Sequence, residues 1–325
     1  MLRYDKLQSV KIAPAGLLTV FAEEKLRHNI ENLRADDGVI YPPSYAQCFP
    51  ETGMDRIEDA ILFSLLLNSI NYCFFTLMGA TYRKYEDIDM TGKAVPNTPS
   101  GSTLMNHCLI KAWPEMRDRY RYSLGVNTAD VNRIFGRIPF PENRARDLSE
   151  VLKHGESILR FLTGNFGTGA EPPKFGYLIA EFINTVFSGY NDWLMKRSQL
   201  FVQMLSGFIR HKFGWRKDSG KRFWGRTGFY NGMTICADYQ IPRTLRYNGI
   251  LTYTPHLAQI VDSGALLELN THEYEKEIRV ASIIASNELA KIVNVPDPVI
   301  DIVLWGMKYD IPAAVPYHRT ITTNY

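Results

Sequence analysis

One long uncharged stretch places the strongest constraint on how this chain can fold. Residues 60–80, AILFSLLLNSINYCFFTLMGA, contain no charged side chain and are long enough to cross a bilayer. Several polar residues interrupt the stretch: Asn68, Ser69, Asn71 and Thr76. Polar groups are rare inside lipid because each must be satisfied without water. The sequence therefore favours a helix buried in a protein core over a membrane span.

Helical periodicity dominates the rest of the chain, and signals for strands are sparse. The segments expected to be helical are 17–34, 56–78, 128–135, 144–162, 175–187, 192–212, 242–247, 255–263, 272–293 and 298–307. A chain of 325 residues with 45% hydrophobic side chains can bury a large core. We therefore expect a mostly α-helical protein with few or no strands. Residues 1–325 are expected to form a single domain or two interlocked helical lobes.

Charge and cysteine usage narrow the functional classes. The chain has 37 basic and 34 acidic residues, a balance that argues against a protein that coats nucleic acid. Its four cysteines lie far apart without a CxxC pair, which is typical of a reducing compartment. The first residues lack the apolar region of a secretory signal. We expect a cytoplasmic protein that forms no stable complex with nucleic acid and does not span a membrane.

The sequence offers no motif for a cofactor or a metal. It contains no GxGxxG after a strand, no P-loop, no HExxH and no GxSxG. The seven histidines show no metal-ligand spacing. We therefore expect neither a cofactor nor a metal, and redox, kinase, zinc-hydrolase and serine-hydrolase classes have no support.

An acidic residue stands at an element boundary in TICADYQIPRTLRYNG, residues 234–249. Asp238 follows an apolar run, and Pro242 suits the first position of a short helix that Asn248 and Gly249 close. Its apolar neighbours on one side predict a partly desolvated carboxylate that the backbone holds in place. The pattern leaves open whether Asp238 is a turn aspartate or the carboxylate of an active site.

Two further polar features are equally ambiguous. Lys196 begins a polar stripe that either faces water or lines a polar pocket, and periodicity does not separate the two. Asn71 is expected on the uncharged helix with Tyr72 and Phe74 beside it. Amides and aromatic rings can hold a flat heterocycle by edge hydrogen bonds and stacking. Buried asparagines can equally satisfy their hydrogen bonds on neighbouring helices.

A basic and aromatic segment at 213–232, FGWRKDSGKRFWGRTGFYNG, also has two interpretations. The mixture can bind phosphate or a nucleobase. It is also typical of a solvated loop whose aromatic rings fold onto the core.

Several short motifs occur in a consistent order along the chain. They are INYCFF at 70–75, KRSQLFV at 196–202, ADYQIPRTLRYNGILTY at 237–253, EKEIRVASIIASNEL at 275–289 and PYHRTITTNY at 316–325. In combination these motifs resemble the queuosine salvage proteins, the queuosine 5'-phosphate N-glycosylase family. The resemblance spans nearly the whole chain.

The resemblance implies a helical fold related to the helix-hairpin-helix DNA glycosylases. It implies a hydrolase that converts queuosine 5'-monophosphate, a small-molecule nucleotide, to queuine and ribose 5-phosphate. We expect this hydrolase to be a monomer. It makes Asp238 and Lys196 the expected catalytic pair. The positions it suggests for substrate binding are Asn71, Tyr72, Phe74, Tyr239, His318 and Arg319. Candidates for the phosphate ligand are Arg319, Arg243 and Arg246, which the sequence does not rank.

The chain departs from the family pattern in three places. Gln240 replaces an arginine, Met204 stands where an acidic residue is expected, and residues 101–107, GSTLMNH, lack a GYWS-like sequence. The departures at Gln240 and Met204 leave open a binding module for a modified nucleotide. The related architecture leaves open a DNA or RNA base glycosylase, against which the near-neutral charge balance argues.

Overall fold

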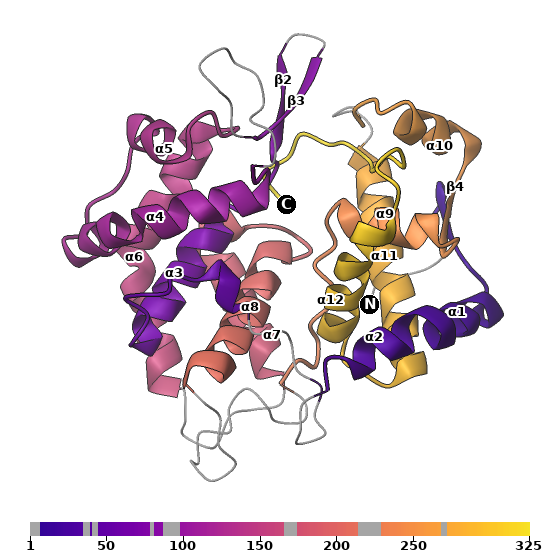
Figure 1. Cartoon of the computed structure of the whole chain (residues 1–325), viewed down its shortest axis with the longest axis horizontal. Coiled ribbons are helices and arrows are strands. Elements are labelled where there is room, and N and C mark those ends of the chain that lie inside the picture. Colours follow the sequence, from indigo (N-terminus) through magenta and orange to yellow (C-terminus); the bar gives the residue numbers. More distant parts are fainter. Residues whose placement is uncertain are drawn as a thin grey trace. The chain divides into compact units, whose positions relative to one another are not determined.

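The computed structural model describes residues 7–34, 40, 45–78, 81–86, 98–165, 174–213, 229–267 and 272–325. The chain divides into two compact units, which we describe separately. Unit 1 comprises Met1–Pro42 and Tyr230–Thr320, and unit 2 comprises Pro43–Phe229 and Ile321–Tyr325. Helices predominate in both units (Figure 1), which confirms the mostly α-helical fold. The likeness to helix-hairpin-helix glycosylases stays a prediction.

Unit 1 brings together the two ends of its chain around one long helix. Its elements are β1 (Val10–Ile12), α1 (Ala15–Phe21), the π-helical turn η2 (Ala22–Leu26), α2 (Arg27–Glu31), α9 (Gln240–Tyr247), β4 (Leu251–Tyr253), α10 (Pro255–Asp262), α11 (His272–Val293), α12 (Asp297–Gly306) and η7 (Met307–Asp310). Helix α11 contacts β1, η2, α9 and α12. Strand β1 pairs antiparallel with β4, with Val10 opposite Tyr253. The core of unit 1 therefore lies around α11.

Unit 2 is built around α3. Its elements are η3 (Ala46–Cys48), α3 (Ile57–Ser69), β2 (Phe75–Met78), β3 (Thr81–Lys84), α4 (Ser102–Arg121), α5 (Thr128–Phe135), α6 (Pro141–Asn165), α7 (Phe175–Val186), η4 (Ser188–Tyr190) and α8 (Lys196–Phe213). Helix α3 packs against α6, α8 and α4. All residues from 60 to 69 are buried, as expected of a helix that is apolar on every side.

The helix predicted for residues 56–78 is too long, and the structure corrects it. Helix α3 ends at Ser69, and Cys73 has a positive φ of 28°, which no helix accommodates. Aromatic residues lose side-chain freedom in helices and favour strands, and the chain beyond Phe74 forms β2, paired antiparallel with β3. Asn71, Tyr72 and Phe74 therefore lie in the connection after the helix and not on one helical face.

Other boundaries also differ from the predicted ones. Helix α8 begins at Lys196 and not at residue 192, because Met195 has a left-handed φ of 54°. Helix α4 occupies a region to which the periodicity assigned no helix, and Pro114 lies inside it. Most of the basic and aromatic segment at 213–232 lies outside the described residues.

Across the part of the chain that the structure describes, no helix combines the length and the apolar character that a membrane crossing requires.

Candidate active site

Asp238 in unit 1 lies just before the first turn of α9. Its Oδ1 accepts hydrogen bonds from the backbone N–H groups of Gln240 at 2.7 Å and Ile241 at 3.2 Å. Helix α9 begins at Gln240, so Pro242 is in the first turn and not at its first position; its missing N–H still costs nothing there. Among the described residues, the recorded bonds to this carboxylate are all made at Oδ1. Asp238 is thus a turn aspartate whose other oxygen can still act on a ligand.

Buried charged side chains hold the backbone on the amino-terminal side of Asp238. The guanidinium Nε of Arg279 on α11 donates to the Ala237 carbonyl at 2.9 Å. The carboxylate Oδ1 of Asp301 on α12 accepts the Cys236 N–H at 2.7 Å. Arg279 is completely buried and Asp301 is 5% exposed.

Tyr239 and His318, both expected to bind substrate, differ in their burial. The ring of Tyr239 is half-buried and lies against Tyr317, with ring centroids 4.7 Å apart. His318 is only 2% exposed. Burial, and to a smaller extent the positive charge of Arg279, lowers the pKa of His318 to about 3. The His318 imidazole is therefore neutral at physiological pH.

The three arginines suggested for a phosphate all contact protein groups. Arg319 donates to the Gly264 carbonyl at 2.8 Å. Arg243 donates to the backbone carbonyls of Pro312 and Val315. Arg246 forms a two-pronged ion pair with Asp262 at 2.7 and 2.9 Å. Each has a structural role, and the structure favours none of the three as the phosphate ligand.

Lys196 in unit 2 is the first residue of α8 and is 6% exposed. Its backbone N–H donates to Asp192 Oδ2 at 3.0 Å, and its ammonium Nζ donates to the Asn71 carbonyl at 3.3 Å. The other members of its stripe, Gln199, Gln203 and Ser206, are also buried. The water-facing interpretation of this stripe is therefore wrong, and the structure brings Lys196 and Asn71 together.

Tyr72 is enclosed by cations. The guanidinium carbons of Arg144 and Arg197 lie 4.3 and 4.8 Å from the centre of its ring. Its hydroxyl donates to Asp147 Oδ2 at 3.2 Å. Tyr72 is fully buried and Phe74 is 5% exposed. These contacts hold Tyr72, and with it the chain segment after α3, in place.

These guanidinium groups also satisfy the chain that follows α3. Arg197 donates to the Ser69 carbonyl at 2.7 Å, and Arg144 donates to the carbonyls of Tyr72 and Cys73. Burial lowers the pKa of both arginines, that of Arg144 to about 10. Arginine is not deprotonated in proteins, so both guanidinium groups are cations and place positive charge next to the chain segment that carries Asn71.

Gln240 and Met204, which depart from the family pattern, both contact other residues of their own unit. The side-chain oxygen of Gln240 accepts a hydrogen bond from Arg243 at 3.4 Å. The sulfur of Met204 lies 3.7 Å from the amide nitrogen of Asn68, in the buried contact of α3 with α8. Residues 101–107 contain the start of α4.

Sequence reasoning missed the buried charges Arg144, Arg197, Asp147, Arg279 and Asp301. One signal was available for Arg279. Glu275 and Arg279 are four residues apart on a face of α11 that is otherwise apolar or small, a spacing that favours an ion pair. Asp301 also had a signal, because it is the one charged residue in the apolar run VIDIVLW, residues 299–305. Arg144, Asp147 and Arg197 sit beside other polar residues, and their sequence pattern does not distinguish burial from exposure.

Within the described residues, no group of three or more His, Cys, Asp or Glu side chains is placed to hold a metal ion. Asp238 lies in unit 1 and Lys196 in unit 2. Their pairing therefore stays a prediction.

Comparison with known proteins finds a family match in the carboxy-terminal part of the chain. Residues 183–325 match the family described as queuosine salvage protein. The match includes Lys196, Asp238, Tyr239, His318 and Arg319. The resemblance that the motifs indicated is thereby confirmed.

Two relatives carry the name queuosine 5'-phosphate N-glycosylase/hydrolase. The protein of Sphaerobacter thermophilus is 25% identical over 303 residues, which cover 83% of each chain. That of Dictyostelium discoideum is 22% identical over 217 residues, 62% of this chain and 63% of its own length.

Proposed function

We propose that this protein is an N-glycosidase that hydrolyses queuosine 5'-phosphate to queuine and ribose 5-phosphate. The observation that carries the proposal is the state of Asp238. Its carboxylate is fixed through Oδ1 by the first turn of α9. Among the described residues no bond to Oδ2 is seen, so this oxygen can contact a ligand. It lies in the segment that matches the queuosine salvage family. Relatives matching 83% and 62% of the chain are named for this reaction.

The proposed reaction needs a fixed negative charge beside the sugar. As the bond from C1' to the base nitrogen breaks, C1' gains oxocarbenium character, which a nearby carboxylate stabilises. Water then adds to C1', and one of its protons ends on the departing base. We assign the carboxylate role to Asp238, because its orientation is set by backbone bonds that need no rearrangement during the reaction.

The departing base also needs assistance, because it must leave with the electrons of the broken bond. A 7-deazapurine has carbon in place of N7, so protonation at N7 cannot help the base depart. Assistance must come from hydrogen bonds to the pyrimidine edge of the base. We assign this part to the Asn71 side chain, with Tyr72 and Phe74 holding the segment that carries it. Lys196, whose buried ammonium already contacts the Asn71 carbonyl, would supply positive charge to an oxygen-rich part of the nucleotide.

The test is a product assay with the purified protein. Incubation with queuosine 5'-monophosphate should release queuine and ribose 5-phosphate in equal amounts, whereas GMP should release no guanine. Tight binding of the nucleotide without any product would instead favour the binding module. Base release from duplex or single-stranded DNA, with a matching gel shift, would favour the nucleic acid glycosylase.

A further inference from the structure

A buried ion pair on α11, between Glu275 and Arg279, contacts the backbone next to Asp238. Arg279 is completely buried and Glu275 is 5% exposed. The Glu275 carboxylate accepts a hydrogen bond from Arg279 Nη1 at 3.3 Å, while Nε of the same guanidinium donates to the Ala237 carbonyl at 2.9 Å. Ala237 immediately precedes Asp238. The rigid, planar guanidinium of Arg279 therefore donates from one nitrogen to the Glu275 carboxylate and from another to the backbone carbonyl of Ala237.

A backbone N–H group one residue earlier, that of Cys236, is bonded by a side chain of another helix. Asp301 on α12, 5% exposed, accepts the Cys236 N–H at 2.7 Å. Ala237 donates its own N–H to the Ile235 carbonyl at 3.0 Å. The residues before Asp238 are thus fixed by α11 and α12, and the residues after it by the first turn of α9.

Burying these charges is expensive for a protein. A buried ion pair often contributes no more to stability than apolar residues of the same size, because desolvation offsets the attraction. An apolar pair on α11 could fill the same space. Apolar residues could not, however, satisfy the Ala237 carbonyl or set the direction of the chain at Asp238. Displacing a reacting group by about 1 Å can cost about 100-fold in rate.

We propose that Arg279, oriented by Glu275, is a positioning residue for the Asp238 carboxylate, with Asp301 as its counterpart on α12. The inference rests on the proposed function. Arg279 acts through the Ala237 carbonyl and does not itself touch the substrate.

The discriminating variant is Arg279→Lys. Lysine keeps the positive charge beside Glu275 but lacks the planar fork that reaches two acceptors in fixed directions. We expect kcat for queuine release to fall about 10- to 100-fold, with KM changed less than about twofold. Lys291→Ala, which removes an exposed cation from the same helix, should leave both constants unchanged. Wild-type kcat in a folded Arg279→Lys protein would overturn the inference.

A double-mutant cycle separates positioning from a general structural effect. If Arg279 acts through Asp238, Arg279→Lys should cost little further activity in an Asp238→Asn background. An equal fold-loss in both backgrounds would overturn the inference. Should Arg279→Lys fail to fold, Glu275→Gln takes its place, since it leaves the guanidinium present but less firmly oriented, and the same two outcomes apply.

Hydrogen exchange keeps this test independent of the proposed function. If the wild-type protein releases no queuine, the proposed function falls, but the positioning inference can still be judged. The amides of Gln240 and Ile241, which donate to Asp238, should then exchange faster in Arg279→Lys than in wild type. Unchanged exchange at both amides would overturn the inference.

Discussion

Asp238 uses its side chain both for local structure and, in our proposal, for chemistry. The two backbone N–H groups that bond Oδ1 belong to the unsatisfied first turn of α9. A change of residue here should therefore affect stability and activity separately, according to which atoms the new side chain keeps.

The first prediction compares Asp238→Asn with Asp238→Ala. Asparagine retains an oxygen that can accept from Gln240 and Ile241, so its free energy of unfolding should match that of the wild type closely. Alanine removes the acceptor and should cost about 1 kcal/mol, the usual value for a lost capping side chain. Chemical denaturation measures both. Equal stability of all three proteins would contradict the structural role of Oδ1.

The second prediction concerns His318 and acid. Its folded-state pKa of about 3 lies below its ordinary value of 6.5, so the folded protein resists protonation at this group. Its contribution to stability is full above pH 6.5 and is lost as the pH falls towards 3, at up to about 1.4 kcal/mol per pH unit. His318→Gln should therefore show a weaker loss of stability between pH 6.5 and 4. Identical pH profiles for the two proteins would contradict a neutral buried imidazole.

The sequence identified individual site residues better than their surroundings. Asp238 was correctly placed at an element boundary, because an apolar run and a proline-containing turn flank it. The burial of Lys196 and the enclosure of Tyr72 could not be foreseen, because Lys196 contacts Asn71 and Tyr72 contacts Arg144, and the members of each pair are far apart in sequence. Periodicity describes one element at a time and does not report which partner covers it.

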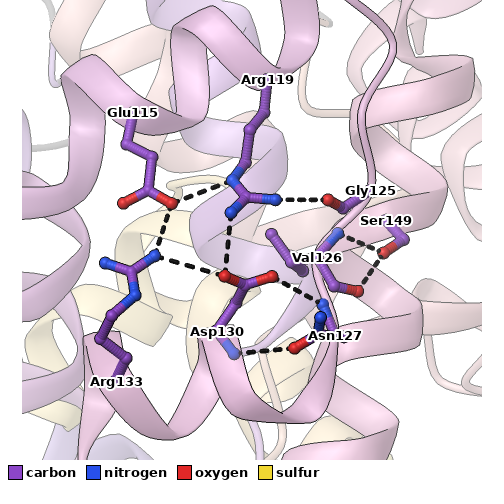
Figure 2. Close-up of polar contacts among 8 residues, drawn as sticks. All are labelled: Glu115, Arg119, Gly125, Val126, Asn127, Asp130, Arg133 and Ser149. Atoms are coloured by element: carbon purple, nitrogen blue, oxygen red, sulfur yellow. Dashed lines mark hydrogen bonds and ion pairs between the residues drawn. The ribbon is translucent and has the colours of Figure 1, made fainter.

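At the scale of elements, a charged network joins α4 to α5 (Figure 2). Glu115 and Arg119 come from α4, and Asp130 and Arg133 from α5. Arg119 bonds Glu115 and Asp130 at 2.9 Å each, and Arg133 bonds Glu115 at 2.6 Å. Bonds from these arginines hold the pKa of Glu115 below its ordinary value. Linked pairs of this kind contribute more than isolated surface ion pairs.

The start of α5 yields the third prediction. Asn127 and Asp130 form a reciprocal capping box, each side chain bonding the other's backbone N–H at 3.0 Å (Figure 2). Asn127→Ala removes the acceptor for the Asp130 N–H and should lower the free energy of unfolding by about 1 kcal/mol. Asn127→Ser keeps an acceptor and should cost less. The account of this cap would be wrong if the two variants had the same unfolding midpoint.

Elements with strong end signals were predicted well. Helix α5 spans residues 128–135 as expected, between the cap at Asn127 and Gly136, whose φ is 63°. Helix α11 also has its predicted bounds. Where the ends lack such signals, prediction was poorer. The uncharged run continues from α3 into β2 with no charged residue between them, so only tertiary contacts decide where the helix ends.

At the scale of the whole molecule, unit 1 depends on contacts between distant parts of the chain. Strand β1 pairs with β4, and the backbone N–H groups of Gln8 and Ser9 donate to the Glu277 carboxylate on α11. The sequence could predict helices but not this pairing, because each strand is only three residues long.

The fourth prediction follows from that dependence. Deletion of residues 1–13 removes β1 and leaves β4 and Glu277 without these partners. Hydrogen exchange should then become faster in β4 and α11 of unit 1, while α3 and α6 of unit 2 keep their wild-type protection. Protection lost equally in both units would show that they unfold together, against our description of unit 1.

The most direct test of the central claim is single-turnover cleavage of queuosine 5'-monophosphate by wild type and Asp238→Asn, with nucleotide affinity measured in parallel. The account predicts that the variant binds the nucleotide with an affinity close to that of the wild type but releases queuine at least about 100- to 1000-fold more slowly, as expected when electrostatic stabilisation of the transition state is lost. Queuine release by Asp238→Asn at the wild-type rate would contradict the account.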